Sequence, residues 1–197
     1  MKDTIIPLRR AERSELSDQA LLSACALGDN LALQELFQRH ADHVYRVLFR
    51  THYIDRKDLD DLVQTTFIEV QRSAKRFDAR ASVSTWIVGI ALNVTRQYVR
   101  GELRRRVAMT AVAELPLAGD GKDLHEQIAH RQALQRLQRG FEALPANLRV
   151  IFTLIDLEGM RGVDVARALK LPEGTVWSRL HQARERLRQL VEEGEQP

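Results

Sequence analysis

The spacing of apolar residues constrains the fold of this chain more than any other feature. Apolar side chains recur three and four positions apart in most segments, and no stretch alternates apolar and polar residues as a β-strand does. Between Leu59 and Lys75, one helical face collects Leu59, Leu62, Val63, Thr66, Phe67 and Val70. The sequence therefore predicts an all-α protein.

Helix-breaking residues divide the chain into two groups of helices. The first group is expected over 17–106 and the second over 123–193, with a Ser17-capped helix at the start of the first. Residues 111–123 hold small side chains, Pro116, two glycines and three acids, which is typical of a flexible linker, and we place that linker at 107–122. Residues 1–16 are polar, contain Pro7 and are expected to form a mobile tail. We predict two small helical domains joined by an acidic linker.

Composition and cysteine content exclude several classes of protein. The 197 residues include one cysteine, Cys25, so no intramolecular disulfide can form, and a reducing compartment is expected. No apolar run approaches about 18 residues, and the N-terminus lacks the apolar segment of a signal peptide. The chain is therefore expected to be soluble and cytoplasmic. Because the formal net charge is only +3, the position of the basic residues matters more than their total.

The C-terminal helices have the pattern of a helix-turn-helix. Val163, Val165, Ala166 and Leu169 form the inner face of a short helix, Leu171–Gly174 form a turn, and Val176 and Leu180 return to the same core. The outer face of the last helix carries Ser178, His181 and Gln182, flanked by Arg179 and Arg184. This arrangement favours base contacts from the polar face and phosphate contacts from the arginines. An ordinary helical hairpin with a solvated polar face is the alternative.

Two further helix faces suggest binding surfaces. Opposite the apolar stripe of 59–75 lie Asp61, Gln64, Ile68 and Arg72, where Ile68 indicates either a protein contact or a stray exposed side chain. The helix over 85–106 is expected to bury Trp86, Ile87, Ile90, Val94 and Tyr98. Its other side aligns Gly89, Asn93, Arg96 and Arg100, with Arg104, Arg105 and Arg106 beyond. This basic row favours close approach to a nucleic-acid backbone, although a solvated charged face is the common alternative.

Two sequence blocks resemble the extracytoplasmic-function (ECF) group of bacterial RNA polymerase sigma factors. DLVQTTFIEVQRS with STWIVGIALNVTRQYVR is similar to region 2 of that family, and LPANLRVIFTLIDLEGMRGVDVARALKLPEGTVWSRLHQARERLR is similar to its region 4. The resemblance covers about residues 17–191, with region 2 in 17–106 and region 4 in 123–193. It implies a factor that binds core RNA polymerase and directs it to promoters.

The resemblance also implies roles for individual positions. The resemblance assigns docking on the polymerase to Asp61, Gln64, Ile68 and Arg72. Recognition and melting of the minus-10 element, with one base flipped into the 77–84 loop, fall to Phe77, Asp78, Ser82, Ser84, Asn93, Arg96, Arg100 and Arg104. Recognition of the minus-35 element falls to Thr175, Trp177, Ser178, Arg179, His181, Gln182 and Arg184. The linker acids Glu114, Asp120 and Asp123 would suit a basic channel of the polymerase.

The same resemblance implies core RNA polymerase and promoter DNA as partners, with an anti-sigma protein as a further candidate. It implies no cofactor, no metal and no homo-oligomer. Trp177 and Gln182 stand where the family commonly has basic residues, and the start of the 161–170 helix lacks the usual aromatic and acidic residues. These departures predict an unusual minus-35 preference. Gln182 is suited to pair with an adenine, whereas Trp177 is expected to pack on the preceding helix.

Other functions find less support in the sequence. His40 and His43, or His125 and His130, are the best candidates for a metal site, but no cysteine or carboxylate cluster completes one, so no enzyme activity is expected. An anti-sigma protein would lack both promoter-reading blocks. A stand-alone helix-turn-helix regulator remains the main alternative, although such proteins usually dimerise and residues 17–106 show no dimer seam.

Overall fold

The computed structural model describes residues 14–51, 54, 56–108 and 138–193, and every regular element within these ranges is helical. The prediction of an all-α fold is therefore confirmed for the described part of the chain. Residues 1–13 and 109–137, which include most of the predicted tail and linker, lie outside the described residues. So do the linker acids, together with His125 and His130.

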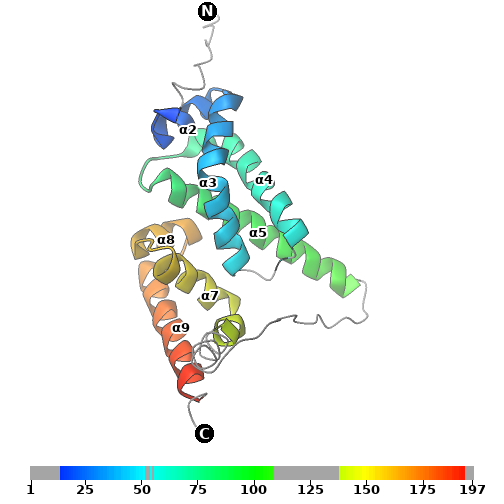
Figure 1. Cartoon of the computed structure of the whole chain (residues 1–197), viewed down its shortest axis with the longest axis vertical. Helices are drawn as coiled ribbons and strands as arrows, with labels where there is room; N and C mark the ends of the chain where they lie inside the picture. The colour runs from blue at the N-terminus through cyan, green and yellow to red at the C-terminus, as the bar shows by residue number, and fades with distance from the viewer. Residues whose placement is uncertain (1–13, 52–53, 55, 109–137, 194–197) are drawn as a thin grey trace, which may run out of the picture.

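The first group of helices builds a bundle around α3 (Figure 1). Local signals set its first boundaries: the Ser17 hydroxyl accepts a hydrogen bond from the Ala20 amide, and the Asp29 carboxylate accepts two from the start of α3. Gly28, with φ +95°, supplies the left-handed residue that ends α2. The elements are α2 (Asp18–Ala26), α3 (Asn30–Thr51), α4 (Arg56–Ser73), the 3₁₀ turn η1 (Ala74–Arg76) and α5 (Val83–Ala108).

The sequence pattern placed the core face of α4 correctly and that of α5 incorrectly. All six residues of the predicted α4 stripe are buried. On α5, by contrast, Trp86, Ile90, Val94 and Tyr98 are only partly buried. The fully buried α5 face is turned by about one residue and consists of Ile87, Val88, Ala91, Leu92 and Thr95. The physical reason is that α5 packs against α3 and α4 and also against α8, so neighbours on more than one side decide its burial.

The second group contains the helix-turn-helix. Its buried residues Val165, Ala166, Leu169, Val176 and Leu180 agree with the predicted core, and Val163 is partly buried. The turn is shorter than predicted, because α9 already begins at Glu173. Residues 138–143 are helical, followed by α7 (Ala146–Phe152), the π-helical turn η2 (Thr153–Leu157), α8 (Gly162–Leu169) and α9 (Glu173–Glu193).

The two groups pack directly on each other (Figure 1). Helix α8 lies on α5, while α7 and η2 contact α3. One continuous cluster of buried side chains includes Ile87 and Leu92 from the first group and Val165 and Leu169 from the second. The sequence predicted only a linker between the groups, so this tertiary contact is a finding of the structure. It brings α8 beside the α5 residues that were expected to approach nucleic acid.

Candidate nucleic-acid interface

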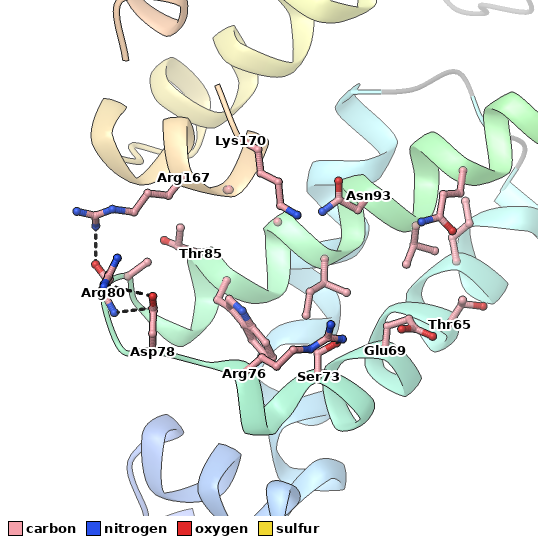
Figure 2. A pocket seen from close by; sticks show the side chains of 18 of the residues that line it. Thr65, Glu69, Ser73, Arg76, Asp78, Arg80, Thr85, Asn93, Arg167 and Lys170 are labelled. Atoms are coloured by element: carbon pink, nitrogen blue, oxygen red, sulfur yellow. Dashed lines mark hydrogen bonds and ion pairs between the residues drawn. The ribbon is translucent and has the colours of Figure 1, made fainter. Parts of the chain in front are cut away.

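A cleft of about 880 Å³ lies between α4, the 77–82 loop, α5 and α8 (Figure 2). Trp86, Ile90 and Val94 contribute apolar surface to it, and Thr85, Asn93 and Gln97 contribute polar groups. Four basic residues also line it, namely Arg76, Arg80, Arg167 and Lys170. A cleft with an apolar wall, amide and hydroxyl groups and basic margins can hold an unstacked base next to its phosphate.

The 77–82 loop at one end of the cleft is held at both of its ends. The ring of Phe77 meets Trp86 edge-on, with the centroids 5.4 Å apart. The Ser82 hydroxyl accepts a hydrogen bond from the Thr85 amide at 3.1 Å and so caps α5. Between them Ala79 has φ +56°, a left-handed conformation that is costly for a residue with a Cβ. Ser84 was predicted to lie in this loop, but it lies in the first turn of α5, because Ser82 is the cap.

The α5 row of Gly89, Asn93, Arg96 and Arg100 is partly covered by α8 and partly exposed. Gly89 is buried, and a Cβ built on it would lie 3.2 Å from the Cβ of Ala168 on α8. Asn93 is half-buried and accepts a hydrogen bond from Arg96 Nη1 at 3.2 Å. Arg96 and Arg100 are exposed, while Arg104 lies in α5 with a side chain outside the described residues. The expectation that Gly89 allows close approach to nucleic acid is wrong for this structure, since the approaching backbone is that of α8.

The outer face of α4 is exposed throughout. Asp61, Gln64, Ile68 and Arg72 all point away from the core, and the Ile68 side chain is 48% exposed. Its neighbour Phe67 turns inward and meets Phe37 with ring centroids 4.8 Å apart. The orientation predicted for this helix is confirmed. The face offers an apolar side chain within a polar rim, as protein interfaces commonly do.

The polar face of α9 is also exposed. Ser178, His181 and Gln182 lie together on it, Thr175 is half-buried near its start, and Arg179 is half-buried at its edge. Arg184 differs from the prediction of a free phosphate ligand, because its guanidinium makes two hydrogen bonds to Asp156, at 2.9 and 2.5 Å. This bidentate pair ties α9 to η2 and offsets the charge of Arg184.

Trp177 packs on the preceding helix, as the sequence predicted. A Cβ built on Gly162 would lie 2.5 Å from Cζ2 of the indole, so the ring occupies the space that only glycine leaves open at the start of α8. The indole nitrogen donates a hydrogen bond to Glu173 at 3.3 Å. The ring remains 48% exposed and therefore also borders the polar face of α9. The sequence did not single out Gly162, because the indole that needs this space lies 15 positions further along the chain.

The structure adds three residues that the sequence did not indicate for these faces. Arg167 and Lys170 reach the cleft from α8, and Figure 2 shows the Lys170 side chain extending toward α5. Glu158, just after η2, binds His43 and Arg50 of α3. Nothing in the sequence marks these residues, because they act on a group of helices more than 60 positions away.

The histidine pair considered as a metal site does not converge. His40 contacts Asp18 at 2.8 Å, whereas His43 contacts Glu158 at 3.3 Å. Within the described residues, 14–51, 54, 56–108 and 138–193, no group of three side chains is placed to hold a metal ion. In the same ranges no helix is both long and apolar enough to cross a bilayer.

Comparison with known protein families assigns each of the two groups of helices to a family region. The family described as Sigma-70 region 2 matches residues 36–105, and the one described as Sigma-70, region 4 matches residues 134–187. The ECF RNA polymerase sigma-E factor of Haemophilus influenzae is 31% identical, with 90% of this chain and 97% of the relative covered. The ECF RNA polymerase sigma factor SigM of Mycobacterium tuberculosis is 34% identical, with 91% and 87% covered.

Solved structures show the same fold. CnrH, in complex with the cytosolic domain of CnrY, superposes with a TM-score of 0.63 at 24% identity, covering 89% of this chain and 97% of CnrH. The sigma factor RpoE of Bartonella quintana, in complex with the anti-sigma factor NepR, gives a TM-score of 0.60 at 19% identity, covering 81% and 96%. With both regions matched in order and relatives covered over most of their length, this chain belongs to the extracytoplasmic-function family of RNA polymerase sigma factors.

Proposed function

We propose that this protein binds bacterial core RNA polymerase, directs it to promoters through minus-10 and minus-35 elements, and promotes initiation without covalent chemistry of its own. One observation carries the proposal. The family's two regions occur in order on a fold in which α4 and α9 each expose a largely polar outer face. The polymerase would perform nucleotide addition.

Docking is assigned to the outer face of α4. Ile68 supplies exposed apolar area, and Asp61, Gln64 and Arg72 supply the polar rim. An apolar centre within a polar rim is the usual anatomy of a protein–protein interface. Arg72 is bound to Glu69 at 2.6 Å, so its contribution depends on exchanging that partner.

Minus-10 recognition is assigned to the cleft and the α5 row. Asn93 can hydrogen-bond a base edge, Trp86 and Phe77 offer aromatic surface near the cleft, and Arg96 and Arg100 are placed for phosphates. Stacking on protein aromatics contributes about 1–3 kcal/mol per base, which helps to hold a base out of the duplex.

Minus-35 recognition is assigned to α9. One helix reads only a few base pairs, and each correct contact gives about 1–3 kcal/mol of discrimination. Region 4 alone would therefore select poorly among the sites of a genome, whereas two linked regions bind with a higher effective concentration. RpoE of Bartonella quintana was solved in complex with the anti-sigma factor NepR, and we include in the proposal that an anti-sigma protein covers some of these faces in this chain.

Core-polymerase binding tests the proposal directly. The double variant Asp61→Arg, Ile68→Arg should bind core polymerase at least about tenfold more weakly while its circular dichroism stays helical, because both side chains are exposed. The matched control is Leu27→Arg with Asp42→Arg, which makes the same kinds of change at exposed positions off α4. If the unaltered chain does not bind core polymerase, the alternative of a stand-alone regulator replaces the proposal.

A further inference from the structure

Trp177 is the bulkiest side chain of α9 and stands near the start of that helix. Its indole is 48% exposed, although the same ring packs on α8. At about 100° per residue, Trp177 lies about 40° from His181 around the helix axis. Residues near the start of a recognition helix are the ones that reach base edges. The indole therefore borders the face proposed to read the minus-35 element, and its chemistry decides what it can contact there.

Two residues hold the indole in one position. Gly162 of α8 is buried, and a Cβ built on it would lie 2.5 Å from Cζ2 and 2.9 Å from Cε2 of the ring. On α9 itself, the indole Nε1 donates a hydrogen bond to Glu173 at 3.3 Å. A side chain that is already held loses little conformational freedom when it binds a ligand. Trp177 is thus pre-organised on α8 with half of its surface in solvent.

The hydrogen bond to Glu173 leaves the indole with only carbon atoms to offer. An indole has one polar group, the Nε1–H donor, and no acceptor. A phosphate that approached this nitrogen would meet the Glu173 carboxylate, and like charges repel at short range. Glu173 also lies in the first turn of α9, where its charge offsets the positive end of the helix dipole. Trp177 is therefore suited to an apolar contact and unsuited to a phosphate.

The arginines on the same edge of α9 are bound to carboxylates. Arg184 makes two hydrogen bonds to Asp156, and Arg188 binds Glu185 at 2.7 Å, which also lowers the pKa of the Glu185 carboxyl. Both arginines lie within about 20° of Trp177 around the helix axis. Phosphate contacts come from cations that are not already compensated. This edge of α9 therefore favours base readout over backbone contact.

The major groove offers one apolar group to such a ring. Adenine, guanine and cytosine present donors and acceptors there, whereas thymine also presents its C5-methyl group. We infer that Trp177 is a specificity-determining residue that reads the methyl group of one thymine in the minus-35 element, with Gly162 and Glu173 positioning the indole. The inference rests on the proposed function. A basic residue at this place, as the family commonly has, would favour a guanine instead.

Uracil in place of thymine tests the methyl contact in the unaltered protein. The full-length chain with core polymerase first selects its preferred sequence from randomised minus-35 DNA. Each selected thymine is then replaced in turn by uracil, which pairs identically and lacks only the methyl group. One replacement should weaken binding about two- to fivefold, as expected for one methyl group removed from water. If no thymine is selected, or if no replacement weakens binding, the inference is wrong.

Trp177→Ala should bind the thymine and the uracil promoter equally at that base pair. Because this variant empties the space beside Gly162, Trp177→Arg, whose long stem covers part of it, is the second variant and should behave alike. Circular dichroism checks that both remain folded. Phe49→Ala removes another exposed aromatic ring, 52% exposed and outside region 4, and should keep the uracil effect. A uracil effect that persists in the Trp177 variants would overturn the inference, as would an equal loss on all sequences with a smaller salt slope.

Glu173 tests the positioning of the ring. Glu173→Ala removes the acceptor of the indole N–H and should reduce the ratio of thymine to uracil affinity, whereas Glu173→Gln keeps an acceptor and should preserve the ratio. A change in the helix dipole alone would alter binding to both DNAs alike and leave the ratio unchanged. Equal ratios in these two variants would contradict the positioning role.

These outcomes separate the two proposals. If the unaltered chain does not bind core polymerase, or if the complex selects no minus-35 sequence, the proposed function fails. If the complex selects a minus-35 sequence but binds thymine and uracil promoters equally, only the role of Trp177 is wrong.

Discussion

The polar face of α5 and the polar face of α9 have similar sequence patterns and different surroundings. Each is one side of an amphipathic helix with an amide and arginines in register. In the structure Ser178, His181 and Gln182 of α9 are exposed, whereas Gly89 of α5 is buried under α8 and Asn93 lies at the edge of that contact. The comparison shows that a polar stripe identifies a possible binding face, while packing between regions decides whether the face is available.

The largest effect is expected for the α5 face that α8 partly covers. Asn93→Ala should leave core-polymerase binding intact and block formation of the open complex, because its amide is the group of the α5 row best placed to meet a base. Permanganate reactivity of promoter thymines measures strand opening. Gln34→Ala, an exposed amide on α3, is the control. If a pre-melted template does not rescue Asn93→Ala, this residue has no role in melting.

On the open face, Gln182→Ala should lose about 1–3 kcal/mol on the native minus-35 element and relax preference at one or two base pairs. Selection from randomised minus-35 DNA measures this change. Glu185→Ala should be nearly neutral, since Glu185 is already bound to Arg188 and Gln189. An unchanged sequence preference in Gln182→Ala would mean that another face of α9 meets the bases.

A smaller effect is expected at the contact between α8 and α9 of region 4. Gly162→Ala should displace the Trp177 ring and cost about 1–3 kcal/mol of folding stability, as overpacking usually does. Thermal unfolding measures the cost, and tryptophan emission reports the displacement. In a Trp177→Ala background the same substitution should be almost without cost. Equal costs in both backgrounds would show that the ring is not what Gly162 accommodates.

The smallest expected effects distinguish Arg179 from Arg184. Arg179→Ala should weaken binding to all sequences alike and reduce the salt slope by about one for each lost phosphate contact. Arg184→Ala should change binding less, because Asp156 already occupies its guanidinium. Asp156→Ala should free Arg184 and slightly strengthen binding to any DNA. Titration of DNA binding at several salt concentrations measures all three, and a stronger effect of Arg184→Ala would reverse the assignment.

Much of this fold follows from local physics that the sequence displays. The all-α class and the buried stripe of α4 follow from apolar spacing, because a helix with one apolar face has one stable way to bury it. The packing of Trp177 on the neighbouring helix was also predictable, since a large indole beside a small helix-turn-helix core gains more from contact than from solvent. The exposure of the α4 and α9 faces follows from the same patterns.

What the sequence alone determined is therefore the set of helices, their apolar faces and the residues available for recognition. The tertiary structure decided the rest: the rotated burial of α5, the pairing of Arg184 with Asp156, and the placement of Arg167, Lys170 and Glu158 on region 2. The physical reason is the separation along the sequence between the residues that make these contacts. Periodicity and capping act over one or two helical turns, whereas these contacts join residues 28 to 115 positions apart, and only the folded chain brings them together.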